Sequence, residues 1–233
     1  MYLSKWVAGR YPGMVMAMMV SFACLQASGQ QHYGDFIRFE NLSVNEGLSQ
    51  STGREILQDS RGFIWIATQD GLNKYDGRNF HIYNNIPGKP GSLSDNFILS
   101  ICEDSSGFLW IGTNGAGINR FNPQSQTFTH FRHQAGQDNS LSHDVVNDVY
   151  QDRQGRLWIG TQNGLNLFQP ENETFIRYLA DPQEPERSLI SCIYEDSQER
   201  FWLGTNAGAL LFDRSSNTIV AQYRYNSLEN SIG

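Results

Sequence analysis

The sequence predicts an all-β protein, a β-propeller made of four-stranded antiparallel blades. One ten-residue phrase occurs four times, with its tryptophan at Trp65, Trp110, Trp158 and Trp202, at intervals of 45, 48 and 44 residues. Within each interval, four short strand-like runs are separated by turn residues, and no helical periodicity is present. Four strands repeated about every 45 residues are typical of propeller blades.

The repeated phrase predicts a tight turn followed by a buried strand. In the second repeat it reads Asp104-Ser105-Ser106-Gly107 and then FLWIGT, from Phe108 to Thr113. Asp and Ser side chains bond the backbone of a turn, and Gly accepts a positive φ there. The apolar run around the tryptophan is typical of a strand with both faces covered. The same phrase begins at Asp59, Asp152 and Asp196.

Residues 1–29 have the pattern of a secretory signal peptide. Lys5 and Arg10 precede the apolar run Met14–Leu25, and Ala27-Ser28-Gly29 offers small residues for cleavage before Gln30. An apolar run of roughly 12 residues is too short to span a bilayer comfortably. We therefore expect export to the periplasm.

Residues 30–233 are expected to form a partial propeller. Its blades are predicted at about 52–85, 96–133, 144–180 and 189–225, with the start of a further link at 226–233. In the second blade, the four expected strands are Asn96–Glu103, Phe108–Thr113, Gly117–Asn122 and Thr127–Arg132.

The segment Asp35–Asn41 (DFIRFEN) resembles the fourth strand of a blade whose other strands are missing. The fourth repeat already has its own outer strand, Thr218–Tyr223. We therefore expect four complete blades plus one N-terminal orphan outer strand, in an incomplete ring such as a truncated chain would form.

The predicted mature chain is acidic. Without residues 1–29 it has 15 Lys and Arg against 24 Asp and Glu, a net charge of −9. This charge argues against nucleic acid or an anionic membrane surface as a partner. Cys102 and Cys192 lie in repeats that are not neighbours, which argues against a disulfide and favours two small buried residues.

The combined motifs resemble the two-component regulator propeller repeat. The phrase ending in WIGT is followed by third strands of the type GLNKYD and GINRFN, and the links end in sequences such as NSLS at Asn139. The resemblance covers roughly residues 35–233. Ala67 replaces Gly in the first phrase, and Glu199 replaces the turn Gly of the fourth.

This resemblance implies the periplasmic sensor region of a hybrid two-component histidine kinase, a type found mostly in Bacteroidetes. Such proteins typically sense oligosaccharides from complex glycans, and the resemblance implies a homodimeric parent protein. It implies membrane contact only through the signal peptide or a helix beyond this sequence. No kinase core is present in these residues, so kinase activity would belong to the implied parent.

The sequence gives no reason to expect a catalytic residue, a metal or a cofactor. Aliphatic neighbours favour blade-to-blade core over sugar stacking for the four tryptophans. Turn positions favour local amide bonding over metal binding for the four phrase aspartates. Gly112–Gly117 has no helix after it, which argues against a phosphate-binding loop. The five histidines lack zinc-type spacing.

A candidate ligand site lies where the long links end. In an up-and-down blade, successive turns alternate between the two rims, so the long links share a rim with the turns between second and third strands. Their amides and carboxylates suit a hydroxyl-rich ligand. The alternative is that they serve only to shape loops. The candidate ligand-binding residues are Asp95, Asn96, Asn114, His143, Asp144, Asn163 and Asn206.

The sequence thus favours a non-catalytic, extracytoplasmic propeller segment that senses an oligosaccharide for a two-component signalling protein. One alternative is a lyase-type propeller enzyme, which would need an acid or histidine cluster at the channel mouth. Another is a truncated interaction scaffold without independent function.

Overall fold

The computed structural model describes residues 41–180 and 183–224, and the strands belong to one compact unit, residues 42–233. The expected signal peptide, all but the last residue of the expected orphan strand, and the link expected at 226–233 lie outside the described residues. No helix within the described part of the chain is long and apolar enough to cross a membrane.

The described strands form four antiparallel sheets of four, and each sheet keeps the order of the sequence, which confirms the predicted fold class of four-stranded antiparallel blades. The first two sheets are β1 (Gly53–Gln58), β2 (Ile64–Thr68), β3 (Gly71–Tyr75) and β4 (Phe80–Tyr83), then β5 (Ile98–Glu103), β6 (Leu109–Thr113), β7 (Ile118–Asn122) and β8 (Thr127–Phe131). The next two are β9 (Val146–Gln151), β10 (Leu157–Thr161), β11 (Gly164–Gln169) and β12 (Thr174–Tyr178), then β13 (Ile190–Glu195), β14 (Phe201–Thr205), β15 (Gly208–Asp213) and β16 (Thr218–Tyr223).

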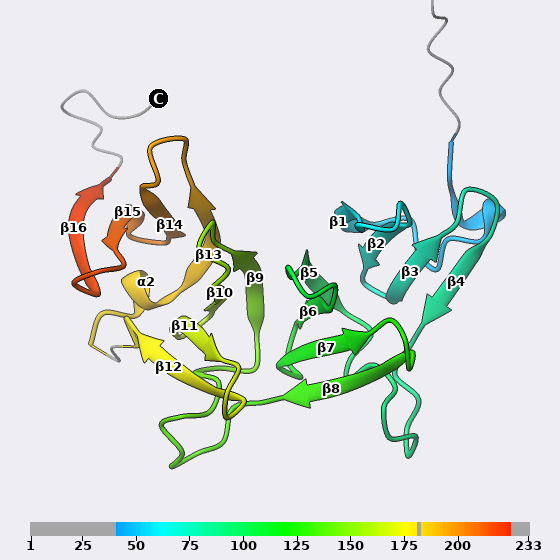
Figure 1. Cartoon of the computed structure of the whole chain (residues 1–233), viewed down its shortest axis with the longest axis horizontal. Helices are drawn as coiled ribbons and strands as arrows, with labels where there is room; N and C mark the ends of the chain where they lie inside the picture. The colour runs from blue at the N-terminus through cyan, green and yellow to red at the C-terminus, as the bar shows by residue number, and fades with distance from the viewer. Residues whose placement is uncertain (1–40, 181–182, 225–233) are drawn as a thin grey trace, which may run out of the picture. The chain divides into compact units, whose positions relative to one another are not determined.

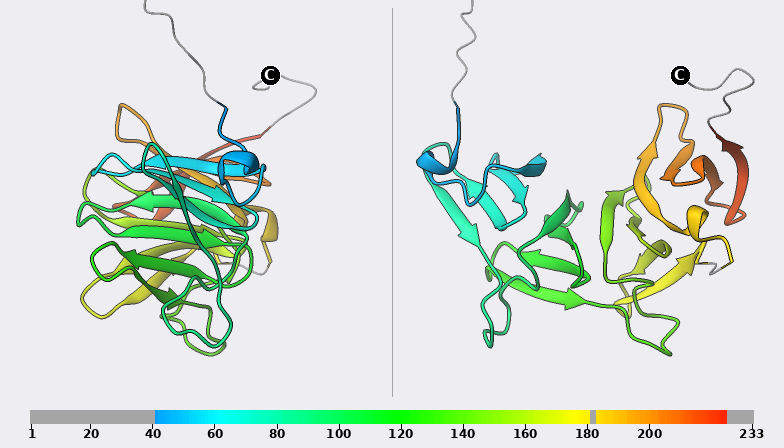
Figure 2. Two further views of the ribbon diagram at one scale, coloured as in Figure 1. Left: turned by 90° about the vertical axis from the view of Figure 1, so that its right-hand side faces the viewer. Right: turned by 180° about the vertical axis from the view of Figure 1, so that it is seen from behind.

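The four sheets lie side by side in chain order, each packed against the next (Figure 1). In Figures 1 and 2 the β1–β4 sheet and the β13–β16 sheet stand at the two ends of this series. The described residues therefore form no closed ring, as predicted. Two single helical turns lie in the links, namely η1 (Val44–Glu46) and α2 (Pro185–Ser188), where the sequence predicted no helix.

Three apolar clusters fill the spaces between neighbouring sheets, which we call the first, second and third joints. Each cluster contains the second-strand tryptophan of the earlier of the two blades that meet there. Trp65, Trp110 and Trp158 are at most 1% exposed. Each ring meets a phenylalanine of the next blade, at centroid distances of 5.5, 4.7 and 5.2 Å. The predicted blade-to-blade role of these tryptophans is confirmed. Trp202 is only partly buried, because no described sheet follows the β13–β16 sheet.

The glycine of the WIGT phrase lets neighbouring blades approach closely. A Cβ at Gly112 would lie 2.9 Å from the carbonyl oxygen of Val146, the first residue of the next blade. At Gly160 it would lie 2.8 Å from the side chain of Ile190, which starts the fourth blade. Contacts this short force neighbouring atoms to shift, so the blade spacing at these joints depends on glycine.

The turn of the fourth phrase keeps its shape without glycine. The turn glycines Gly62, Gly107 and Gly155 have φ values of 90°, 80° and 79°, and Glu199 takes the same left-handed region at 62°. A side chain is uncommon in this conformation, so the turn is held against a local backbone cost.

We predict that Gly112→Ala lowers the free energy of unfolding by about 1–3 kcal/mol, because the added methyl overpacks the second joint. Urea unfolding followed by tryptophan fluorescence measures the change. Gly53→Ala is the matched control, since a Cβ there meets only the Ile66 side chain at 3.8 Å. Equal stability losses in the two variants would contradict the close-approach explanation.

Candidate functional site

The long links and the turns between second and third strands share one rim, as the alternation of turns predicts. The Gly71 amide donates to the carbonyl of Asn96, and the Gly117 amide donates to the carbonyl of Asp144, both at 2.8 Å. Each bond joins the turn of one blade to the link that enters the next blade. The rim is therefore a continuous hydrogen-bonded edge across the first three blades.

Four of the candidate residues lie in the links, and their side chains fix the link backbone. Asp95 Oδ1 accepts the Phe97 amide at 3.1 Å, and Asp144 Oδ1 accepts the His133 amide at 2.7 Å. Asn96 Oδ1 accepts the Asn85 amide at 2.7 Å. His143 Nδ1 accepts the Val145 amide at 3.0 Å, which places the proton of a neutral His143 on Nε2.

The other three candidates lie in the turns, and they differ from the link residues. Asn114 and Asn206 are exposed, and Asn163 is half-buried. None of the hydrogen bonds seen in the described part of the chain uses their side-chain amides. Asn114 bonds the second link through its backbone, since its amide donates to the Phe97 carbonyl at 2.9 Å. Asn206 stands apart, beside the α2 link, where the Ala207 amide donates to the Glu186 carbonyl.

A buried asparagine in the third strand holds each of the first three links. Asn166, fully buried in β11, accepts the Ser142 amide at 2.9 Å and donates to Ser142 Oγ at 2.8 Å. The same clasp joins Asn73 to Ser49 and Asn119 to Ser94. Sequence reasoning missed this clasp, although the third-strand asparagine and the link serine recur together.

The fourth blade lacks the clasp because its link is shorter. Four residues separate the link leucine from the next strand in the first three links, as between Leu141 and Val146, whereas Leu189 directly precedes Ile190. The missing residues include the serine, and buried Leu210 stands where the asparagine would be. Removing both polar partners together leaves no unsatisfied group.

The family described as "Two component regulator propeller" matches residues 92–115, 140–163 and 186–207. Three stretches of the chain are thus similar to this propeller repeat. Each matched stretch runs from the end of a link through the first two strands to the next turn, so it includes both parts of the rim.

Three relatives illustrate what these repeats resemble. Histidine kinase P4 of Formosa agariphila is 38% identical over 82 residues, which cover 35% of this chain and 6% of that protein. The extracellular domain of the putative hybrid two component system BT3049 from B. thetaiotaomicron is 23% identical with a TM-score of 0.61, covering 80% of this chain and 32% of that chain. A streptogramin B lyase structure is 14% identical with a TM-score of 0.59, covering 82% of this chain and 60% of that chain. The two structural likenesses show the propeller fold, and this chain spans only part of each relative.

At the opposite rim, each of the four repeats joins its turn aspartate to its own tryptophan. The indole Nε1 donates to Oδ2 of the aspartate six residues earlier, at 2.9, 2.7, 2.9 and 2.9 Å in the four repeats. The other oxygen accepts turn amides, such as those of Gln154 and Arg156 at Asp152. Local amide bonding was predicted, whereas the indole bond was not, although the fixed spacing of Asp and Trp was a readable signal.

The charge state of these aspartates follows from their donors. Burial alone would raise the pKa of Asp152, but hydrogen bonds from Trp158 and Arg156 hold this pKa below its usual range. The pKa of Asp59 is lowered in the same way, against the effect of burial, by Trp65, Phe63 and Arg61. No group of three or more His, Cys, Asp or Glu side chains within residues 41–180 and 183–224 is arranged to hold a metal ion.

A second series of side chains crosses the joints between the innermost strands. Glu55 accepts the Ile101 amide at 2.7 Å, Ser100 Oγ accepts the Val149 amide at 3.0 Å, and Asp148 accepts the Ile193 amide at 2.6 Å. All three residues follow a bulge in the first strand of their blade. Bulges re-aim side chains, which here places an acceptor against the next blade.

Cys192 occupies the same position in the fourth blade and is exposed, so the expectation of two buried cysteines is wrong for Cys192. Its strand, β13, has no described blade beyond it to cover this position. Cys102 is partly buried and unpaired, and burial raises the pKa of its thiol to about 12.

We predict that the stability of the Asp148→Asn variant, relative to that of the unaltered chain, increases as the pH rises. Burial raises the pKa of Asp148, and burial with a smaller effect of the Asp148 charge raises that of Glu55. The folded state therefore binds these protons more tightly than the unfolded state, and their contribution to stability is lost as the pH rises through the folded pKa.

The measurement is the difference in unfolding free energy between Asp148→Asn and the unaltered chain at pH 4 and pH 7. Acidic groups that do not interact with Asp148 cancel in this difference, and loss of the Asp148 charge lowers the pKa of Glu55, which moves the difference in the same direction. The asparagine keeps an acceptor for the Ile193 amide and carries no charge. The difference should shift in favour of the variant at pH 7, and a constant difference or the opposite shift would contradict the burial argument.

Proposed function

We propose that this chain is the ligand-sensing propeller segment of an extracytoplasmic two-component signalling protein, and that its long-link rim binds an oligosaccharide. The family match and the likeness to a histidine kinase support the signalling role. In this proposal the segment is exported, catalyses no reaction, binds no nucleic acid and works within a homodimeric parent protein.

The observation that carries the proposal is that the link residues and the turn residues of the rim have different hydrogen-bonding roles. The link side chains of Asp95, Asn96 and Asp144 are committed to backbone amides, which makes the rim rigid. The turn asparagines Asn114, Asn163 and Asn206 bring side-chain amides that the described residues leave available. Amides offer both donors and acceptors, as hydroxyl-rich ligands require, on a preorganised edge.

The rim also gives binding a route to signalling. Asn114 bonds the second link, and the neighbouring Gly117 bonds the third. A ligand that bridges these positions would favour one arrangement of adjacent blades. It would shift the population of signalling states only as far as its affinities for those states differ.

We predict that the chain binds one or more oligosaccharides from a panel of polysaccharide digests, detected as a rise in melting temperature and then by calorimetric titration. Asn114→Ala combined with Asn163→Ala should weaken binding at least about tenfold, because two direct amide contacts are lost. Asn172→Ala, at an exposed turn on the opposite rim, is the matched control.

Unchanged affinity in the double variant would contradict the rim as the site. Steady consumption of the bound oligosaccharide would instead favour the lyase-type alternative, because a sensor returns its ligand unaltered.

A further inference from the structure

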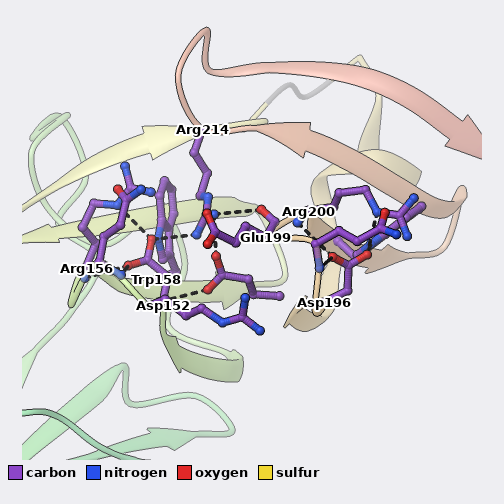
Figure 3. Close-up of polar contacts among 12 residues, drawn as sticks. Asp152, Arg156, Trp158, Asp196, Glu199, Arg200 and Arg214 are labelled. Carbon is purple, nitrogen blue, oxygen red and sulfur yellow. Dashed lines mark hydrogen bonds and ion pairs between the residues drawn. The ribbon is translucent and has the colours of Figure 1, made fainter.

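A largely buried arginine lies in the joint between the third and fourth blades, on the rim of tight turns. Arg214, in the turn between β15 and β16, donates to Asp152 Oδ2 at 3.0 Å (Figure 3). It donates to Glu195 Oε1 at 2.6 Å as well. It also donates to the Glu199 carbonyl at 3.0 Å, and its guanidinium lies 4.8 Å from the centre of the Phe201 ring. The side chain is only 10% exposed.

The joint between the second and third blades has a corresponding socket, with Pro170 in place of Arg214 and the amide of Gln151 in place of the Glu195 carboxylate. Counting from the repeated Asp and Trp, each position of the Arg214 socket has a counterpart one blade earlier. The counterparts of Asp152, Glu195, Glu199, Phe201 and Arg214 are Asp104, Gln151, Gly155, Leu157 and Pro170. All five counterparts line one cavity of about 450 Å³, which we name the second-joint socket.

No described cation forms an ion pair with the carboxylate of the second-joint socket. Asp59, Asp152 and Asp196 each form an ion pair with an arginine, at 3.0, 2.8 and 2.6 Å. Among the described residues Asp104 has no such pair, because Ser106 and Phe108 stand where the other repeats place arginines. Arg120 contacts the nearby Trp110 ring but is held by Glu173 at 2.7 Å.

The hydrogen bonds inside the socket leave room for one more donor. Asp104 Oδ2 accepts the Trp110 indole, whereas its counterpart Asp152 Oδ2 accepts an indole and two guanidinium groups. Gln151 Oε1 accepts the Ser105 amide and keeps a second lone pair. Gln151 Nε2 already bonds the Gly155 carbonyl, so an incoming group would use the Asp104 and Gln151 oxygens.

We propose that the second-joint socket binds the guanidinium group of an arginine side chain, supplied either as the free amino acid or within a peptide. The planar guanidinium is the group that the fold itself places in the equivalent socket of the next joint. Its forked donors suit the Asp104 carboxylate and the second lone pair of Gln151 Oε1. Arg156 also lines the cavity, but it is paired with Asp152 at 2.8 Å, and exposed Glu171 adds negative charge. An alkylammonium offers no such fork and binds more weakly.

The test is a titration of the intact chain with N-acetyl-arginine methylamide, followed by calorimetry and by the Trp110 environment in NMR spectra. N-acetyl-lysine methylamide is the matched ligand control, and free arginine and an Ala-Arg-Ala peptide separate the two sources. Gln151→Glu restores the carboxylate of the Arg214 socket and should tighten binding about tenfold. Failure of every arginine ligand to bind, or equal binding of the lysine ligand, would overturn the proposal.

Two substitutions locate the binding. Asp104→Asn should weaken it at least about tenfold, but it also weakens the bond to Trp110. Pro170→Arg avoids this problem, because it places an internal guanidinium where Arg214 stands one blade later. This variant should stay folded and lose binding of added arginine. Full affinity in folded Pro170→Arg protein would overturn the assignment to this socket.

Discussion

The hydrogen bond from each tryptophan indole to the aspartate six residues earlier is the interaction on which the rest of the structure depends. A tryptophan buried between two sheets needs a partner for its N–H, since an unpaired donor there costs about 1–3 kcal/mol. The phrase provides that partner from its own turn. The same carboxylate accepts the turn amides, so one side chain shapes the turn, satisfies the indole and aims the ring at the next blade. Because every repeat carries this arrangement, each blade presents the same face to the blade that follows, and neighbouring joints become comparable position by position.

Because the same arrangement recurs in every repeat, the fold could be predicted from the sequence. The recurring tryptophan phrase located the second strand of every blade, and the turn residues around it located the other three. The exposed position of Cys192 was not readable in the same way. Residue chemistry favours burial of a cysteine, but burial here depends on whether another blade covers the strand. Strand periodicity also missed the one-turn helix α2, which lies in the shortened link before Ile190.

The location of the candidate rim was predictable from the sequence, but the roles of its side chains were predictable only in part. Alternation of turns between the two ends of a sheet was enough to bring Asn114 beside the second link. The sequence could not separate Asp95 and Asp144, whose carboxylates hold the links, from Asn163, whose side-chain amide is not bonded by any described residue, because all three are polar loop residues. The hydrogen bonds of Asn166 and of Arg214 each depend on residues brought together by folding. Asn166 bonds a serine 24 residues earlier, and Arg214 bonds an aspartate 62 residues earlier. Only their recurrence, or their loss in one repeat, is visible in the sequence.

The most direct test of the central claim is a double-mutant cycle at Asp104 and Trp110, where none of the described arginines pairs with the carboxylate. The unfolding free energies of Asp104→Ala, Trp110→Phe and the double variant give the coupling between the two side chains. Trp110→Phe keeps an aromatic ring in the joint but removes the N–H and part of the ring. The packing loss occurs with and without Asp104, so it cancels in the cycle, which then reports the hydrogen bond. If this bond organises the blade, the coupling should be at least about 1 kcal/mol in favour of the intact pair. A coupling near zero would contradict the account, because the joint would then rest on ring packing alone.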